Sequence, residues 1–200
     1  MESKAKMSLM ECALGDDWAA LPEALRAHYQ RDRNEDIGRL DIEYPILMQP
    51  YLHVLRLFGA LVNRRGQAVP TTVEKGMEGE VQFWRRSIRF PDGRVVFFKS
   101  YWVYAGGNEL IEFVNPFLGL RMAVCVKDGQ LHYSGQHLVL QMGRVRLPIF
   151  EWLLLGHTTI VEEALDDRSF SMDFRLIHPW FGQIFRYAGV FGTHKTVDLQ

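Results

Sequence analysis

EVQFWRRSIRFPDGRVVFFKSYWVY, residues 80–104, is the stretch that decides the fold class of this chain. Two runs rich in Val, Ile, Phe, Trp and Tyr flank Pro91-Asp92-Gly93. The residue types of the two runs favour a pleated, half-buried surface, whereas Pro, Asp and Gly favour a tight turn. The stretch therefore predicts a β-hairpin.

Similar patterns continue toward the C-terminus. Residues 120–126 alternate, residues 127–130 (KDGQ) are typical of a tight turn, and residues 170–176 alternate again. A change of phase near Gly135 predicts a bulge or a sharp bend. About eight or nine strands joined by short turns predict a curved antiparallel sheet or a partial β-barrel. The expected fold class is α+β, mainly β.

The first third of the chain predicts two helices packed against this sheet. Residues 1–12 are predicted to be a flexible leader, and a single domain is expected over residues 13–194. Residues 16–30 (DDWAALPEALRAHYQ) begin with a capping Asp and carry an apolar stripe at helical spacing. Residues 50–63 predict the second helix, which is apolar on nearly all sides.

The helix at residues 50–63 leaves two interpretations open. A uniformly apolar helix is typical of one buried between a sheet and another helix. Alternatively, the helix is a lid or a membrane-facing element whose Arg64-Arg65 end contacts phosphate. Its apolar run is shorter than the roughly 20 residues that span a bilayer, and His53 and Arg56 interrupt it. No transmembrane segment is therefore expected.

The composition excludes several classes of function. Hydrophobic residues make up 48% of the 200 residues, and the net charge is −1, which gives no overall attraction for nucleic acid or anionic membranes. Two cysteines and the absence of a signal-peptide pattern indicate a reducing, cytoplasmic location. Glycine motifs for nucleotides or dinucleotides are absent from the sequence, so no cofactor is expected. The seven histidines are scattered, so no metal site is expected either.

Two carboxylates offer candidate acid/base groups. Glu163 and Asp173 flank the same predicted turn on neighbouring strands, so they are expected to approach each other. Two nearby carboxylates of different burial can divide the roles of acid and base. The alternative, which we favour, is that Asp173 lies on the polar face and pairs with Arg175 or with an arginine of the adjacent strand.

Arg86 is the strongest single clue to a ligand. It shares its strand parity with Trp84 and Ile88, which predicts that it points into the core. An inward arginine must be paired or must bind an anion. Glu112 and Glu163 are candidate partners, and pairing is the favoured reading. If Arg86 instead lines a cavity, it can hold the carboxylate or phosphate of a ligand.

The chain resembles the uncharacterised domain often found at the C-terminus of saccharopine-dehydrogenase-like proteins. The resemblance implies a domain of unknown activity, and it implies a separately encoded dehydrogenase-like protein as one candidate partner. No catalytic residue is implied. The resemblance extends from residue 13 to residue 192, and its motifs are residues 13–29 (ALGDDWAALPEALRAHY), 83–85 (FWR), 112–116 (EFVNP) with 118–119, 128–133 (DGQLHY), 147–148 (LP), 170–174 (FSMDF), 179–182 (PWFG) and 187–189 (YAG).

Three functions are compatible with the sequence. The first is a soluble protein that binds a lipid or fatty-acid-like molecule inside the sheet, with Arg86 at the headgroup. The second is an interaction module, docking a dehydrogenase-like partner or forming a homodimer. The third is an enzyme acting on a hydrophobic small molecule, with Asp173, Glu163 or a histidine as acid/base. The expected lining of the interior is Trp84, Arg86, Phe98, Trp102, Met122, Phe170 and Phe174.

Overall fold

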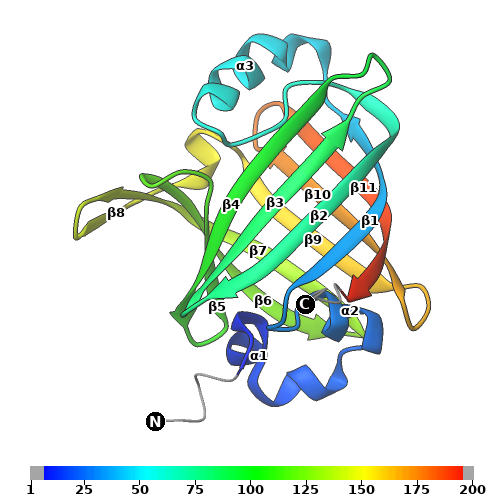
Figure 1. The fold of residues 1–200 in the computed structure, drawn as a ribbon. Helices are drawn as coiled ribbons and strands as arrows, with labels where there is room; N and C mark the ends of the chain where they lie inside the picture. Colours follow the sequence, from blue (N-terminus) through cyan, green and yellow to red (C-terminus); the bar gives the residue numbers. More distant parts are fainter. Residues whose placement is uncertain (1–6, 196–200) are drawn as a thin grey trace.

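The computed structural model describes residues 7–195, and eleven antiparallel strands dominate it (Figure 1). The strands are β1 (Asn34–Glu43), β2 (Gly66–Glu78), β3 (Val81–Arg89), β4 (Val95–Gly106), β5 (Glu109–Phe113), β6 (Leu118–Lys127), β7 (Gln130–Met142), β8 (Val145–Ile149), β9 (His157–Ala164), β10 (Ser169–His178) and β11 (Gly182–Lys195). The predicted hairpin is β3–β4, joined through Gly93 at a φ of 81°.

The strands close into a barrel. Their order is β6-β5-β4-β3-β2-β1-β11-β10-β9-β7, and β7 also pairs with β6, which completes a ring of ten strands. β8 continues from β7 as a hairpin that projects from the ring (Figure 1). The sequence predicted only a curved sheet or a partial barrel, because alternation reveals strands without revealing whether the first and last of them meet.

The predicted bulge near Gly135 is confirmed. The β6–β7 register shifts where Arg121 faces His137 and Met122 faces Gly135. At this shift, the edge of β7 that faces away from β6 changes its partner strand. Residues 131–134 pair with β9, whereas residues 138–142 pair with β8. The bulge therefore lets one strand serve both the ring and the projecting hairpin.

Short helices cover the two ends of the barrel (Figure 1). The helices α1 (Leu9–Leu14), η2 (Gly15–Ala20) and α2 (Glu23–His28) lie at one end, and η3 (Ile46–Met48) and α3 (Gln49–Leu57) lie at the other, while η4 (Glu151–Leu153) follows β8. Of the expected leader, residues 1–6 lie outside the described residues, whereas residues 9–12 belong to α1, which buries Leu9 and Met10.

The helix predicted at residues 50–63 is not buried between the sheet and the first helix. It is the shorter α3, and of its residues Leu52 and Leu55 are buried, whereas Val54 and Leu57 are exposed. It lies at the opposite end of the barrel from α1 and α2 rather than between them and the sheet (Figure 1). None of the helices within residues 7–195 combines the length and the apolarity needed to cross a membrane.

Close strand packing at Gly189 gives a stability test. A Cβ on Gly189 of β11 would lie 2.1 Å from the backbone carbonyl oxygen of Arg39 on β1, so Gly189→Ala forces these two strands apart. Such overpacking costs about 1–3 kcal/mol. We expect a reduced free energy of unfolding in urea. Gly76→Ala is the matched control, because its Cβ would meet nothing within 4 Å in β2. Equal stability of the two variants would contradict this packing.

Candidate functional site

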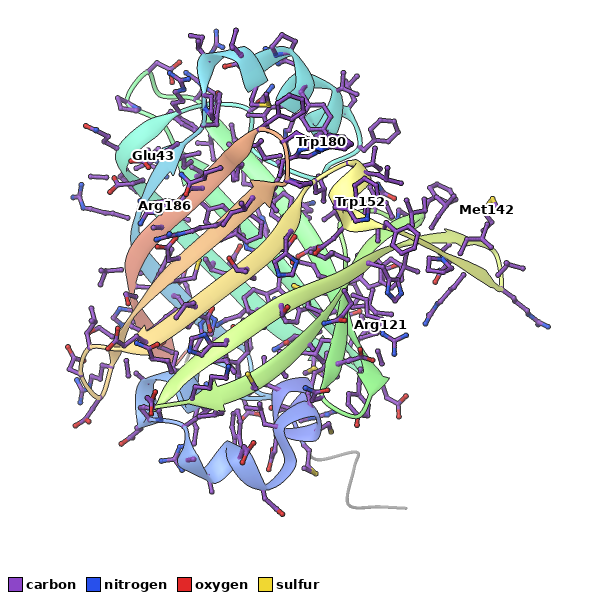
Figure 2. All side chains as sticks on the ribbon, turned by 180° about the vertical axis from the view of Figure 1, so that it is seen from behind. Glu43, Arg121, Met142, Trp152, Trp180 and Arg186 are labelled. Atoms are coloured by element: carbon purple, nitrogen blue, oxygen red, sulfur yellow. The ribbon has the colours of Figure 1, made fainter. Side chains whose placement is uncertain are left out.

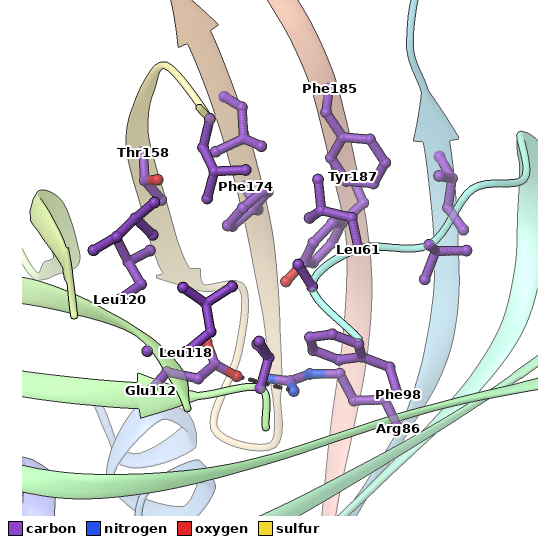
Figure 3. A pocket seen from close by; sticks show the side chains of 18 of the residues that line it. Leu61, Arg86, Phe98, Glu112, Leu118, Leu120, Thr158, Phe174, Phe185 and Tyr187 are labelled. Atoms are coloured by element: carbon purple, nitrogen blue, oxygen red, sulfur yellow. Dashed lines mark hydrogen bonds and ion pairs between the residues drawn. The ribbon is translucent and has the colours of Figure 1, made fainter. Parts of the chain in front are cut away.

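Two adjoining cavities, here called the apolar chamber and the polar chamber, lie inside the barrel. The apolar chamber, toward α3, has a volume of about 70 Å³ (Figure 3). The polar chamber, toward α2, has a volume of about 40 Å³. Arg86, Glu112 and Tyr187 line both chambers and so form the boundary between them. The apolar chamber is otherwise lined mainly by Leu40, Ile42, Ala60, Leu61, Val62, Ile88, Phe98, Leu118, Leu120, Leu138, Phe174 and Phe185.

Arg86 and Glu112 form an ion pair at this boundary. Arg86 Nη1 donates to Glu112 Oε1 at 3.2 Å and to Ser100 Oγ at 3.0 Å, and Ser100 Oγ donates to Glu112 at 2.6 Å. The guanidinium lies 5.0 Å from the ring centroids of Trp84 and Phe98. The expectation that Arg86 points inward and pairs with Glu112 is therefore confirmed.

A second ion pair lies at the α2 end of the interior. Lys75 of β2 reaches Asp36 of β1, with Nζ 2.5 Å from Oδ2, and both side chains are 1% exposed. His28 of α2 joins them, with its Nδ1 2.7 Å from Asp36 Oδ2 and 2.6 Å from Lys75 Nζ. Lys75 also donates to the backbone carbonyl oxygen of His28 at 2.6 Å. The cluster fastens α2 to the first two strands.

The carboxyl group of Glu162, on β9, adjoins this cluster. Tyr29 donates its hydroxyl proton to Glu162 Oε2 at 2.7 Å, and Tyr133 donates to the Tyr29 hydroxyl. His28 Nε2 lies 4.0 Å from Glu162 Oε1. Tyr29, which follows α2, Tyr133 of β7 and Glu162 of β9 are all buried and line the polar chamber.

Burial shifts the ionisation of these groups. Loss of solvation raises the pKa of Glu162 to about 7 and lowers the pKa of His28 to about 4. It also lowers the pKa of Lys75 to about 8. Burial alone would raise the pKa of Asp36, but the neighbouring His28 and Lys75 outweigh it and lower that pKa. At neutral pH, the cluster therefore holds a Lys75–Asp36 ion pair and an uncharged His28, and Glu162 keeps its proton to a higher pH than an exposed glutamate does.

Two buried polar atoms beside the polar chamber have no hydrogen-bond partner among the described residues. They are Nε1 of Trp102 and Oδ1 of Asp36, and both residues line this chamber. One atom is a donor and the other is an acceptor. Because an unpaired buried polar group is costly, these two atoms are available to a polar group that enters the chamber.

The predicted binding residues mostly meet inside the barrel. Trp84 and Trp102 stack with ring centroids 5.1 Å apart beside the polar chamber. The predicted residues distribute as follows: Trp84, Trp102 and Phe170 line the polar chamber, Phe98 and Phe174 line the apolar chamber, and Arg86 lines both. Met122 is fully buried in the core, outside the described lining of either chamber. The role of these residues in binding stays a prediction.

The predicted pair of carboxylates does not form. Asp173 faces Val161 in the β9–β10 ladder, and Glu163 faces Ser171. Partial burial alone would raise the pKa of Asp173, but hydrogen bonds from Arg175 and Arg186 lower it to about 2. The favoured reading of Asp173 as a surface ion-pair residue is correct, while Glu163 is exposed. The turn is closed by Leu165 and Ser169, which places Ser171, and not Asp173, opposite Glu163.

Sequence reasoning missed Lys75 and Glu162, although the signal existed. Lys75 shares its strand parity with Thr71 and Val73, and all three are buried. Glu162 likewise shares parity with the buried Thr158 and Ile160. Arg86 was predicted to point inward because it is a charged residue on the buried parity of its strand. The same criterion, applied to every strand, identifies Lys75 and Glu162.

The pH dependence of stability tests the buried Glu162. A folded-state pKa of about 7, above the 4.5 of an exposed glutamate, means that the folded protein keeps a proton that the unfolded chain loses. The contribution of Glu162 to stability is therefore present below pH 4.5 and is lost as the pH rises toward 7. His28 acts oppositely, because its lowered pKa makes stability rise between pH 4 and 6.5.

The two effects offset each other in the native chain, so we compare it with Glu162→Gln, which keeps an acceptor for Tyr29. We expect the stability advantage of the native chain over Glu162→Gln to shrink by roughly 2–3 kcal/mol between pH 4.5 and 7. Urea unfolding of both proteins at several pH values measures it. Glu163→Gln, on the exposed side of the same strand, is the control and should leave the profile unchanged. A difference that does not vary with pH would refute the raised pKa.

Comparison with known families gives one result. A model of the family described as Domain of unknown function (DUF4166) matches residues 21–191. No curated protein matches the chain. The match confirms the expectation of a domain of unknown function. The expected association with saccharopine-dehydrogenase-like proteins stays a prediction, and so does the dehydrogenase-like partner. Within residues 7–195, no three His, Cys, Asp or Glu side chains gather as a metal site.

Proposed function

Because the chain belongs to the DUF4166 family, whose description names no activity, we propose a function from the interior of the barrel: it binds an apolar small molecule that carries one polar head. The observation behind this proposal is the position of Arg86. It stands where an apolar chamber ends and a smaller, polar chamber begins. The tail of the ligand occupies the apolar chamber, and the head lies at Arg86.

The Arg86–Glu112 pair restricts the chemistry of the head. Glu112 already neutralises Arg86, so a ligand carboxylate would bring a second negative charge beside Glu112. Like charges at short range in a poorly solvated site are costly. A hydroxyl group avoids this cost, because it accepts from Arg86 and donates to Glu112. A fatty alcohol, or a fatty acid that binds with its proton, is therefore preferred over an ionised fatty acid.

The size of the apolar chamber requires its cover to move. Its volume of about 70 Å³ is less than the roughly 150 Å³ of a cavity that admits benzene. Ala60, Leu61 and Val62, which follow α3, line the chamber on the side of the α3 end. These three side chains are buried in the core, and the chain just beyond them is held at the surface by the Arg64–Asp92 ion pair at 2.7 Å. Surface pairs of this kind contribute at most about 1 kcal/mol, so the segment is suited to act as a lid.

Replacement of the Arg86–Glu112 ion pair by two apolar residues tests the binding site. Replacing one partner alone would strand a buried charge, so the variant is Arg86→Met combined with Glu112→Leu. We expect it to fold and to lose at least about tenfold in affinity for a long-chain alcohol, because both hydrogen bonds to the head disappear. Displacement of a fluorescent fatty alcohol measures the affinity.

Arg121→Met with Glu109→Leu is the matched control, since that ion pair lies outside the described lining of both chambers. Native mass spectrometry of the purified protein, followed by extraction of bound molecules, complements the titration. Unchanged affinity in the Arg86/Glu112 variant would place the head elsewhere. A protein that binds neither alcohols nor fatty acids and carries no extractable ligand would overturn the proposal.

Glu162 favours a second function, in which the barrel moves a proton on its ligand. A carboxyl group with a pKa near 7 in a closed chamber matches the requirement for a general base. Glu162 would take a proton from a carbon next to a carbonyl group, breaking that C–H bond and leaving an enolate. The enolate oxygen would accept a hydrogen bond from Nε1 of Trp102, a donor that lines the same chamber and has no partner among the described residues. Return of the proton to the same or another carbon completes an exchange or an isomerisation.

Deuterium exchange tests this second function. A ketone such as cyclohexanone, incubated with the protein in heavy water, should exchange its α-protons faster than with buffer alone. Proton magnetic resonance follows the exchange. We expect Glu162→Gln to abolish the acceleration and Glu163→Gln to preserve it. Acceleration that survives Glu162→Gln would exclude Glu162 as the base, and no acceleration with native protein would leave binding as the only function of the interior.

A further inference from the structure

We propose that the α3 end of the barrel docks on an anionic membrane surface. The α3 end comprises the connections at residues 44–65, 90–94, 114–117, 150–156 and 179–181, which the topology brings together at one end of the ring. The proposal goes beyond ligand binding, because it concerns the outside of the barrel and does not depend on what the interior holds.

Large apolar side chains are exposed on several of these connections. Leu57 of α3 is 85% exposed, Leu47 of η3 is 82% exposed, and Trp180 in the β10–β11 turn is 73% exposed. Phe117, Phe150 and Phe181 are each more than 60% exposed. Figure 2 shows Trp152 and Trp180 on this end of the barrel, and their ring centroids are 6.0 Å apart. Scattered exposed residues need no explanation, but a group of this size at one end indicates a contact surface.

The aromatic side chains suit the surface of a bilayer. Trp and Phe residues favour the boundary between water and lipid. An element that lies on this boundary needs an apolar face and neighbouring positive charge, not a membrane-spanning length. α3 has this character, because Val54 and Leu57 face out and Arg56 stands between them in sequence.

The charges of the α3 end select a negative partner. Its five connections contain four arginines and two carboxylates, although the whole chain has a net charge of −1. One carboxylate, Asp92, is paired with Arg64, and the other, Glu151, is buried. The arginines are Arg56, Arg64, Arg65 and Arg94. Basic residues beside apolar ones match a membrane that contains anionic lipids.

The same charges disfavour self-association through this end. In a symmetric dimer, each copy presents the same patch to the other, so arginines would face arginines. Like-charge contacts of this kind suppress association. An anionic lipid surface satisfies both the apolar and the basic groups at once. It also meets the segment at residues 58–62, which covers the apolar chamber.

Vesicle flotation tests the docking. The full chain, freed of bound ligand, is mixed with vesicles of phosphatidylcholine alone or of phosphatidylcholine with phosphatidylserine. We expect binding to the mixed vesicles, weaker binding in high salt, and little binding to phosphatidylcholine. Trp180→Ser with Phe181→Ser removes apolar contacts, and Arg65→Glu with Arg94→Glu reverses the charge. Each pair should lower the affinity at least about tenfold.

Arg33→Glu with Arg168→Glu is the matched control, because it makes the same change in net charge with exposed residues at the opposite end of the barrel. It should bind the mixed vesicles like the native chain. Equal losses in the control and in the Arg65/Arg94 variant would show that only net charge matters and would overturn the proposal. So would the absence of vesicle binding, or a dimer in solution that the Trp180/Phe181 variant converts to monomer. None of these outcomes depends on whether the interior binds a ligand.

Discussion

Closure of the barrel depends on one short seam. β7 meets β9 over four residue pairs only, whereas β10 and β11 are joined by ten. The edge of β7 turns away from β9 at Gly135, where the carboxyl group of Glu151 enters, and a Cβ on Gly135 would lie 2.1 Å from Glu151 Oε2. Glu151 Oε1 in turn lies 2.6 Å from Nδ1 of His157, at the start of β9. Beyond Gly135, a partly buried contact between side chains thus replaces the ladder hydrogen bonds between β7 and β9.

Once the ring is closed, every inward-pointing charge must find its partner inside. Arg86 finds Glu112, two strands away around the ring, and Lys75 finds Asp36 on the adjacent strand. Buried ion pairs add little net stability compared with apolar side chains of equal volume. An apolar interior would therefore serve stability as well or better. The retention of these pairs beside two cavities supports a role in holding a ligand.

The local sequence pattern predicted the strands, but it did not predict which strands pair to close the ring. The β3–β4 hairpin, the inward direction of Arg86 and the bulge near Gly135 all follow from alternation and turn chemistry, which act over a few residues. Ring closure and the cluster of His28, Asp36 and Lys75 depend on residues brought together from separate elements. Glu163 shows the limit of this reasoning. Its neighbour Glu162 is the buried residue, because parity relative to the core, not proximity to a turn, decides which carboxylate enters the barrel.

The distribution of charge shows the same limit at the level of the whole chain. The net charge of −1 predicted no attraction for anionic surfaces. The antiparallel fold, however, sends alternate connections to opposite ends. The described connections at the α2 end hold nine carboxylates and four arginines, over residues 7–33, 79–80, 107–108, 128–129 and 165–168, and the α3 end holds the reverse excess. Because charges act over roughly 8 Å in physiological salt, a partner at one end responds mainly to the charges of that end. A composition average therefore conceals a basic, apolar surface that only the order of the strands assembles.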